Sequence, residues 1–399
     1  MLSNFHTDDH AIQHPAPLDG TALRILCVMG ARPNFMKIAP ILAAFKACGP
    51  GVGTLLVHTG QHYDQAMNAQ YFDALGLPDP AVNLGVGSGS HAAQTAEVML
   101  RFEPVLDQYG PDALLVVGDV NSTLACALVA AKKGVAVVHV EAGLRSGDRS
   151  MPEEVNRVLT DQLSDLLFTT EESAAANLAR EGIATERIYF AGNVMIDTLR
   201  ASLARAVPAA TLAASAGRSG FGTGADGYAV LTLHRPSNVD DPVKLRALLG
   251  AVTRIGSRTP VIFPVHPRTR AVIEQSGLAG LLDVPGVLLL PPAGYLQMLG
   301  LMRDARLVLT DSGGIQEETT ALGVPCITLR DNTERPITVA EGSNIVAGTD
   351  PVRILAVYEE VLAGGAGGRA KRVPRYWDGR AAERIAVTLV GWLRQRRAR

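Results

Sequence analysis

The chain alternates between short apolar segments and longer amphipathic ones. Short, mostly apolar runs are typical of buried strands, and they occur at residues 23–29, 53–58, 166–170, 188–191 and 307–310. A helical segment follows most of these runs before the next one begins. Repeated strand–helix units predict parallel sheets joined by right-handed crossovers. The predicted fold class is therefore α/β.

The alternation lapses once, between residues 200 and 228, where alanine, serine and glycine dominate. Because 399 residues are too many for one compact core, we predict two domains, at residues 21–200 and 201–375. The opening residues 1–20 are polar and contain prolines, which predicts a flexible leader without the apolar region of a signal peptide. The closing residues 376–399 predict a final helix.

Composition narrows the classes of partner. Lysine and arginine number 37 against 39 aspartate and glutamate residues, so no charge excess points to nucleic acid or an anionic membrane. No apolar run is long enough to cross a bilayer. Cys27, Cys48, Cys126 and Cys326 lack the paired spacing of zinc or redox sites. They predict reduced thiols in a cytoplasmic protein, and no metal site is expected.

Three carboxylates in the first half follow strand or helix boundaries. Asp119 and Glu141 each end an apolar run, and Glu153 follows a proline where a helix should begin. The carboxyl ends of parallel strands converge on one crevice, so we expect these acids to share a cleft. Each alone has a structural alternative, since Asp119 can cap a helix and Glu153 suits a first helical turn. Together they favour acid/base function.

The second half contains a glycine turn suited to a phosphate. In the run RLVLTDSGGIQEETTALG, Ser312, Gly313 and Gly314 lie between a strand and a helix predicted at residues 315–322. A helix N-terminus with free N–H groups and no side chain in the way binds phosphate. Glu318, one turn further, is placed to accept hydrogen bonds from a ribose diol. With Arg335 at the next strand end, this pattern predicts a nucleoside diphosphate site.

Basic and histidine residues at other strand ends extend this prediction. Arg32 and Lys37 follow the first strand at a helix start, an arrangement that suits an anion without naming it. His234 and His266 end two successive apolar runs of the second half, and an arginine follows each within two residues. Two such histidines favour an anion-facing role over a purely structural one.

Eight motifs in this order resemble those of the non-hydrolysing UDP-N-acetylglucosamine 2-epimerases. They are GARPNFMKIAP, GDVNSTLA, HVEAGLRSGD, MPEEVNR, TLHRPSNVDD, FPVHP, DSGGIQEE and RDNTERP, spread over about residues 22–350. The resemblance implies two Rossmann-like domains of the glycosyltransferase B type, with the active site in the interdomain cleft. It also implies that the helix in residues 376–399 packs back on the N-terminal domain, and that the protein is a homodimer.

The resemblance implies a reversible C2 epimerisation of UDP-N-acetylglucosamine to UDP-N-acetylmannosamine without a cofactor. UDP leaves by anti elimination, and it then adds back to a 2-acetamidoglucal intermediate. Catalytic roles carry over by motif to Asp119, Glu141, Glu153 and His234. Contacts with the UDP-sugar carry over to Arg32, Lys37, Arg157, His266, Ser312, Gly313, Gly314, Glu318 and Arg335.

Three positions depart from the family pattern. Pro236 and Ser237 stand where many members have an arginine and a glutamate, and Tyr63 stands where many have an arginine. In bacterial members those residues help hold a second, activating substrate molecule, so the resemblance does not extend to that allosteric site. The departures resemble a branch that acts on UDP-2,3-diacetamido-2,3-dideoxyglucuronate, which is the alternative substrate. A hydrolysing epimerase, a glycosyltransferase and an inactive UDP-sugar sensor are the alternative functions.

Overall fold

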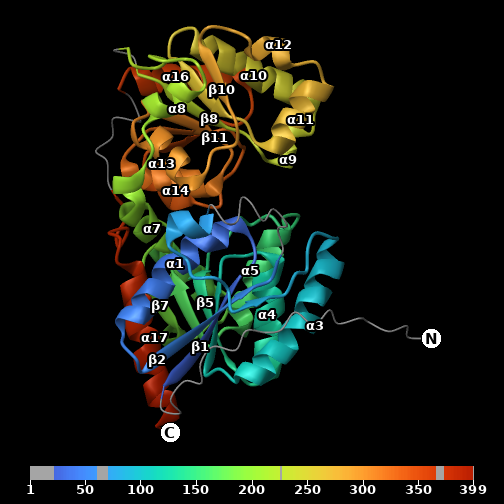
Figure 1. Ribbon diagram of the computed structural model, residues 1–399, viewed down its shortest axis with the longest axis vertical. Helices are drawn as coiled ribbons and strands as arrows, with labels where there is room; N and C mark the ends of the chain where they lie inside the picture. Colours follow the sequence, from blue (N-terminus) through green and yellow to red (C-terminus); the bar gives the residue numbers. More distant parts are fainter. Residues whose placement is uncertain (1–21, 61–70, 225–226, 365–372, 399) are drawn as a thin grey trace, which may run out of the picture.

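The protein consists of two lobes stacked along its long axis, each built around one parallel sheet (Figure 1). The computed structural model describes residues 22–60, 71–224, 227–364 and 373–398, and it leaves the side chain of Arg32 undescribed. The predicted leader at residues 1–20 lies outside these residues, and so does Tyr63, one of the positions that depart from the family pattern. The predicted α/β class with two parallel-sheet domains is confirmed.

The first sheet has seven strands in the order β3-β2-β1-β4-β5-β6-β7, all paired in parallel. Its strands are β1 Leu23–Met29, β2 Val52–His58, β3 Val82–Asn83, β4 Ala113–Val117, β5 Ala136–Ala142, β6 Leu166–Thr169 and β7 Ile188–Phe190. Its helices are α1 Arg32–Ala47, α3 His91–Tyr109, α4 Asn121–Lys132, α5 Pro152–Leu163, α6 Glu172–Arg180 and α7 Val194–Ser202, with a 3-10 turn at Thr185–Arg187.

The second sheet has six strands in the order β10-β9-β8-β11-β12-β13. Its strands are β8 Ala229–Thr232, β9 Val261–Pro264, β10 Val287–Leu290, β11 Leu307–Thr310, β12 Cys326–Thr328 and β13 Asn344–Val346. Its helices are α8 Ala209–Ser215, α9 Pro236–Val239, α10 Pro242–Gly256, α11 Pro267–Gln275, α12 Ala279–Leu282, α13 Tyr295–Arg303, α14 Gly313–Leu322, α15 Pro336–Ala340 and α16 Pro351–Leu362.

Strand order reverses in the middle of each sheet, between β1 and β4 and between β8 and β11. This is the order of Rossmann-type sheets, in which ligands bind outside the carboxyl ends of the strands at the reversal. The loops that leave β1, β4, β8 and β11 carry the motifs predicted to bind and react with the ligand. Topology alone therefore directs the candidate residues of each domain to one edge.

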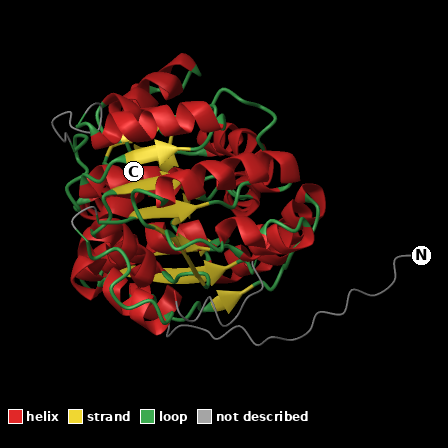
Figure 2. Cartoon of the chain, turned by 90° about the horizontal axis from the view of Figure 1, so that it is seen from above, coloured by secondary structure: helices red, strands yellow, loops and turns green. Residues whose placement is uncertain are grey.

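Helices cover both faces of the sheets, as Figure 2 shows from above. In β1, Ile25 and Cys27 pack with α1 on one face, and Leu26 and Val28 pack with residues of α3 and α4 on the other. Successive side chains of a strand point to opposite faces, so both faces of a central strand must be apolar. This double burial explains why the strands appear in the sequence as continuous apolar runs.

The segment at residues 200–228, where the pattern lapses, contains ordered structure. Helix α7 continues to Ser202, a 3-10 turn follows at Leu203–Arg205, and α8 comes next. Ala209 and Ala213 of α8 are buried in a core of the second domain with Val230. Alanine gives little contrast between the faces of a helix, so the pattern predicted only a boundary where a packed helix exists.

The final helix, α17 at Ala381–Arg397, runs along the first domain (Figure 1). Ile385 and Leu389 are buried in the core that contains β1 and α1. The carboxylate of Asp197 accepts hydrogen bonds from the first two backbone N–H groups of α17 at 3.1 and 2.7 Å, and burial raises the pKa of Asp197 to about 6. No helix within the described ranges has the length and apolar character needed to cross a membrane.

Candidate active site

Side chains from both domains meet at Glu141, near the end of β5. Lys37 of α1 donates to Oε1 of Glu141 at 2.7 Å, and Arg335, which follows β12 of the second domain, donates to the same oxygen at 3.1 Å. All three side chains are buried. The acid predicted for catalysis therefore lies where the two domains touch, held by one cation from each.

Glu141 has an unusual backbone conformation. Its φ is 75°, a region that glycine adopts freely and other residues rarely do, and only Tyr376 shares it among the other described non-glycine residues. A β-bulge between Val140 and Ala142 accompanies it. Such strain persists where surrounding contacts enforce it, and it gathers at functional sites. Oε2 of Glu141 is buried and has no hydrogen-bond partner among the described residues, so it can face a ligand.

Asp119 lies beside this group, just beyond the end of β4. Arg157 of α5 bonds to its carboxylate and also to Glu154, at 2.6 Å. Burial would raise the pKa of Asp119, but Arg157 and Lys37 outweigh burial and hold the pKa below its usual value. The pKa of Glu141 is lowered in the same way, with Lys37 and Arg335 outweighing burial. Both predicted acids are therefore carboxylates at neutral pH.

The two glutamates in the first turn of α5 differ in their surroundings. Glu154 is buried and accepts from the backbone N–H groups of Ser146 and Gly147 at 3.0 and 2.9 Å, so it holds the loop after β5. Glu153 is partly exposed, and none of the described side chains bonds to it. Asp119 and Glu141 thus share the electrostatic effect of Lys37 and Arg335, while no bond from a described side chain holds the carboxylate of Glu153.

His234, after β8, is oriented by an aspartate that was not among the predicted site residues. Its Nδ1 lies 2.9 Å from Oδ1 of Asp311, which is fully buried. Asp311 also accepts from the backbone N–H groups of His234 and Arg235. The His266 ring lies 5.9 Å from the His234 ring. His266 uses Nδ1 to cap α11, accepting from the N–H of Arg268 at 3.3 Å.

The N-terminus of α14 lies at the glycine turn that was predicted to bind an anion. Ser312 is its N-cap residue, and its side chain makes no capping bond. A side chain at Gly313 would have its Cβ 2.7 Å from Oε1 of Glu334, so the glycine is required for this approach. Glu334 in turn pairs with Arg235 at 3.2 Å and Arg330 at 2.8 Å. A helix N-terminus flanked by arginines favours a phosphate group.

Glu318 lies in the second turn of α14. It is buried, and its Oε1 has no hydrogen-bond partner among the residues that the structure describes. Burial raises the pKa of Glu318 to about 8, although the hydroxyl of Tyr295 opposes that rise. An unpaired buried carboxyl oxygen is costly unless a ligand satisfies it, which agrees with the predicted contact to a ribose diol.

His139 and Asp161 were not predicted, and they bond to the backbone next to the two predicted acids, Asp119 and Glu141. Nδ1 of His139 lies 2.6 Å from Asp161, and Nε2 lies 2.8 Å from the carbonyl oxygen of Gly118, the residue before Asp119. Asp161 also accepts from the N–H of Gly143, two residues after Glu141. The ends of β4 and β5 are thus tied together. A histidine within an otherwise apolar strand was the available signal.

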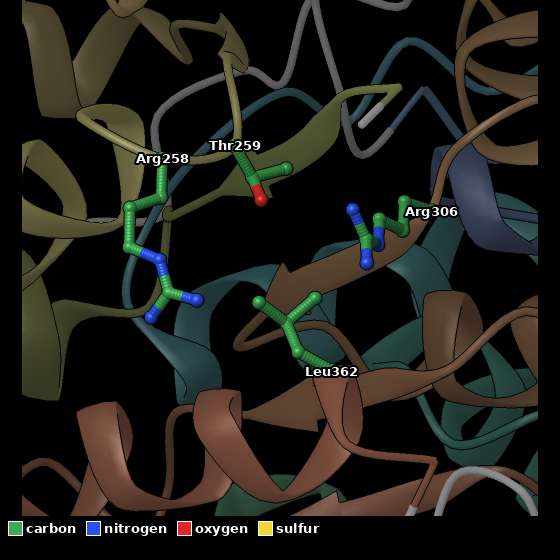
Figure 3. Close-up of a pocket in the computed structure, with 4 residues that line it drawn as sticks. All are labelled: Arg258, Thr259, Arg306 and Leu362. Atoms are coloured by element: carbon green, nitrogen blue, oxygen red, sulfur yellow. The ribbon is translucent and has the colours of Figure 1, made fainter. Parts of the chain in front are cut away.

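Other features of the molecule lie apart from this site. A pocket lined by Arg258, Thr259, Arg306 and Leu362 (Figure 3) is at the amino ends of the strands, because Thr259 and Arg306 precede β9 and β11. It therefore opens on the edge opposite to the acids. Within the described residues, no cluster of three or more histidine, cysteine, aspartate or glutamate side chains is arranged to hold a metal ion.

Comparison with known proteins identifies the family of this chain. The model of the UDP-N-acetylglucosamine 2-epimerase family matches residues 48–390. The UDP-N-acetylglucosamine 2-epimerase of Methanococcus maripaludis is 41% identical over 342 residues, covering 85% of this chain and 92% of that protein. The UDP-2,3-diacetamido-2,3-dideoxy-D-glucuronate 2-epimerase of Pseudomonas aeruginosa is also 41% identical, over 329 residues, covering 82% and 88%.

Solved structures agree with the sequence relatives. The crystal structure of the Methanocaldococcus jannaschii UDP-GlcNAc 2-epimerase in complex with UDP-GlcNAc and UDP is similar with a TM-score of 0.81 at 39% identity, covering 92% of this chain and 99% of that one. The predicted two-domain fold of the glycosyltransferase B type is confirmed by this likeness. The chain belongs to the UDP-N-acetylglucosamine 2-epimerase family, and it is an epimerase.

Proposed function

We propose that the protein interconverts UDP-N-acetylglucosamine and UDP-N-acetylmannosamine by elimination and re-addition of UDP. The observation that carries the proposal is Glu141, a strained, ionised carboxylate whose Oε1 is held by cations of both domains and whose Oε2 is buried without a hydrogen-bond partner among the described residues. Two relatives named UDP-N-acetylglucosamine 2-epimerase are each 41% identical to the chain. The same proposal includes a homodimer in the cytoplasm, and light scattering of the purified protein tests the dimer.

Elimination requires a base at C2 of the sugar. The base takes the C2 proton, the electron pair of the C–H bond forms the C1–C2 double bond, and the C1–O bond breaks so that UDP leaves with its electrons. Asp119 and Glu141 are ionised because cations lower their pKa, so both can accept a proton. Re-addition reverses these steps with the proton delivered to the opposite face, for which Glu153 and His234 are the remaining candidate groups.

The departing UDP needs stabilisation and retention. In our proposal the diphosphate lies at the N-terminus of α14, against Ser312, Gly313 and Gly314, where the helix dipole and nearby arginines stabilise the developing charge. Glu318 binds the ribose. Arg32, Lys37, Arg157, His266 and Arg335 complete the contacts to the phosphates, the sugar and the catalytic acids. Both domains must remain closed until the intermediate has reacted, because released UDP cannot add back.

Proton NMR in deuterated water tests the proposal directly. UDP-N-acetylglucosamine is incubated with the protein and, as a matched control, with its Glu141→Gln variant. We expect deuterium at C2 and signals of UDP-N-acetylmannosamine with the wild type alone. Accumulation of free UDP and N-acetylmannosamine would instead identify a hydrolysing epimerase.

A second substrate has a specific observation in its favour. The Pseudomonas aeruginosa relative that acts on the diacetamido uronate is as similar as the archaeal one, and Pro236 and Ser237 depart from the pattern of many plain epimerases. If the spectrum of UDP-N-acetylglucosamine stays unchanged, UDP-2,3-diacetamido-2,3-dideoxyglucuronate is tested in the same way. An unchanged second spectrum contradicts the epimerase proposal for both sugars.

A further inference from the structure

Two side-chain contacts cross between the domains at the active site. Arg335 makes one of them and Glu317 makes the other, and these two residues also contact each other. Arg335 of the second domain reaches Glu141 of the first at 3.1 Å. Glu317 of the second domain accepts a hydrogen bond from the side-chain amide of Asn193, which precedes α7, at 2.8 Å. Arg335 and Glu317 form an ion pair with each other, with Nε 3.0 Å from Oε1. A continuous chain of contacts therefore leads from Asn193 to Glu141.

The members of this chain are almost completely enclosed. The side chains of Glu317 and Glu141 are each 2% exposed, that of Arg335 is 8% exposed, and Asn193 is fully buried. Long charged side chains lose considerable conformational freedom when held in this way, and buried charges are unfavourable without partners. The guanidinium therefore has one well-defined position only while both carboxylates flank it.

Glu317 is also linked to the nucleotide site through its helix. It lies four residues after Gly313 on α14, so the two positions are on the same face of that helix. The N-terminal end of this face meets the proposed diphosphate, and the next turn meets Arg335. Glu318, the following residue, has a buried carboxyl oxygen with no hydrogen-bond partner among the described residues. Adjacent glutamates on α14 thus have different surroundings.

Charges along the chain alternate in a way that makes Arg335 sensitive to Glu317. Lys37 and Arg335 flank Glu141, and Glu317 lies beyond Arg335. Burial and the negative charge of Glu141 raise the pKa of Glu317 to about 7, while Arg335 opposes this. Without Glu317, Arg335 retains Glu141 of the first domain and the neighbouring Glu334 of the second as competing partners, so one of the contacts that fix its position is lost.

We propose that Glu317 is a positioning residue, which orients Arg335 onto Glu141 when the two domains close and so couples nucleotide occupancy of α14 to the catalytic carboxylate. This inference rests on the proposed function. It assigns to Glu317 no contact with the sugar or the nucleotide. Its effect is on Oε1 of Glu141, whose two cations hold Oε2 toward the ligand. A closed cleft with Arg335 in place also retains UDP between elimination and re-addition.

The test compares Glu317→Gln and Asn193→Ala with the wild type. Glu317→Gln keeps the shape and an acceptor oxygen but removes the charge, and Asn193→Ala removes the cross-domain partner together with the side-chain N-cap of α7. We expect kcat to fall about 100-fold in Glu317→Gln, the size of effect that a 1 Å misplacement of a reacting group produces. Calorimetry should give a Kd for UDP within about threefold of the wild-type value, since a threefold change is under 1 kcal/mol. The fraction of turnovers that end in free UDP should rise in both variants.

A matched control is Glu359→Gln. Glu359 also pairs with an arginine of the second domain, Arg258, but on the far edge of the sheet, and both side chains are more than half exposed. Its kcat, KM and UDP release should equal those of the wild type.

A double variant separates a positioning role from a structural one. If Glu317 acts through Arg335, then Glu317→Gln combined with Arg335→Lys should have the same kcat as Arg335→Lys alone. Fully additive losses would overturn the proposal, and so would a wild-type kcat in Glu317→Gln. A loss of UDP affinity as large as the loss of kcat would assign Glu317 to the nucleotide site instead, which also overturns it. If Glu317→Gln fails to fold, Asn193→Ala and Arg335→Lys carry the same comparison.

Failure of the proposed function is seen separately. The wild type in the same assay either epimerises UDP-N-acetylglucosamine or does not, whatever the variants do. With wild-type turnover established, a change confined to Glu317→Gln, Asn193→Ala and Arg335→Lys bears on the positioning role alone.

Discussion

Four carboxyl groups at the facing edges of the two domains differ in charge; Asp119 is partly exposed, and Glu141, Glu317 and Glu318 are buried. In the first domain, cations hold the pKa of Asp119 and Glu141 below the usual values. In the second domain, burial raises the pKa of Glu317 to about 7 and of Glu318 to about 8. Desolvation acts on all four, and Lys37 and Arg335 lower the pKa of both Glu141 and Glu317. Glu141 has in addition a direct hydrogen bond from Lys37, whereas the negative charge of Glu141 raises the pKa of Glu317. Ionised carboxylates that can accept a proton lie on one side of the cleft. Carboxyl groups whose pKa is about 7 or 8 lie on the other.

The largest expected effect comes from neutralising the first pair. Asp119→Asn and Glu141→Gln should each lower kcat by about 10²–10⁴-fold, the range for removing a general acid or base. The Kd for UDP, measured by calorimetry, should change little because the contacts proposed for the diphosphate at α14 and for the ribose at Glu318 lie in the other domain. The isosteric variant Glu154→Gln alters a carboxylate that holds the loop after β5. Its kcat and Kd are compared with those of the two catalytic variants. Wild-type turnover in both catalytic variants would remove these acids from the mechanism.

Removing a cation from the first pair should shift its behaviour toward that of the second. Lys37→Met deletes the largest of the charges that lower the pKa of Glu141, so this pKa should rise. The acid limb of the kcat profile should then move to higher pH, because Glu141 takes up its proton earlier as pH falls. A profile measured from pH 4 to pH 9 tests the shift. An unmoved acid limb would show that Glu141 does not govern it.

Neutralising Glu318 should affect binding rather than chemistry. Glu318→Gln should raise the Kd for UDP by up to about tenfold, since a hydrogen bond between uncharged groups contributes about 0.5–1.5 kcal/mol. Titration with 2′-deoxy-UDP is the matched control. This ligand lacks the ribose 2′-hydroxyl, so its Kd should differ less between wild type and variant. Equal losses for both ligands would place Glu318 away from the ribose.

The smallest expected effect is on stability without ligand. The folded-state pKa of Glu318, about 8, lies above its ordinary value of 4.5, so the folded state holds a proton that the unfolded chain releases. The contribution of Glu318 to stability therefore falls as pH rises from 4.5 to about 8. Urea unfolding should show Glu318→Gln gaining stability relative to wild type across this window. A constant difference would contradict the raised pKa.

Local patterns in the sequence anticipated much of the fold and part of the site. The strands at residues 23–29 and 307–310 have the predicted bounds, because each is an apolar run buried on both faces. Gly323, with φ 68°, ends α14 where the sequence predicted, although the helix begins at Gly313, two residues earlier than expected. Asp119 and Glu141 were found because a charge directly after an apolar strand is conspicuous.

Other site residues gave no local signal. Asp311 resembled an ordinary turn residue, and its role depends on His234, 77 positions away. His139, inside an apolar strand, depends on Asp161, and Glu317 depends on Asn193, 124 positions away. The helix α8 was missed because alanine contributes little to a periodic pattern. Each of these features exists only once distant segments pack together.

The sequence by itself determined the order of strands and helices, the edge of each sheet that carries the chemistry, and the family. These follow from periodicity, strand ends and motifs, which are local in the chain. Only the tertiary structure decided which partners each charge has: Glu141 lies 104 positions from Lys37 and 194 from Arg335, yet bonds to both. Charge state and orientation depend on distances through space within a medium of low dielectric constant, and sequence spacing does not contain those distances.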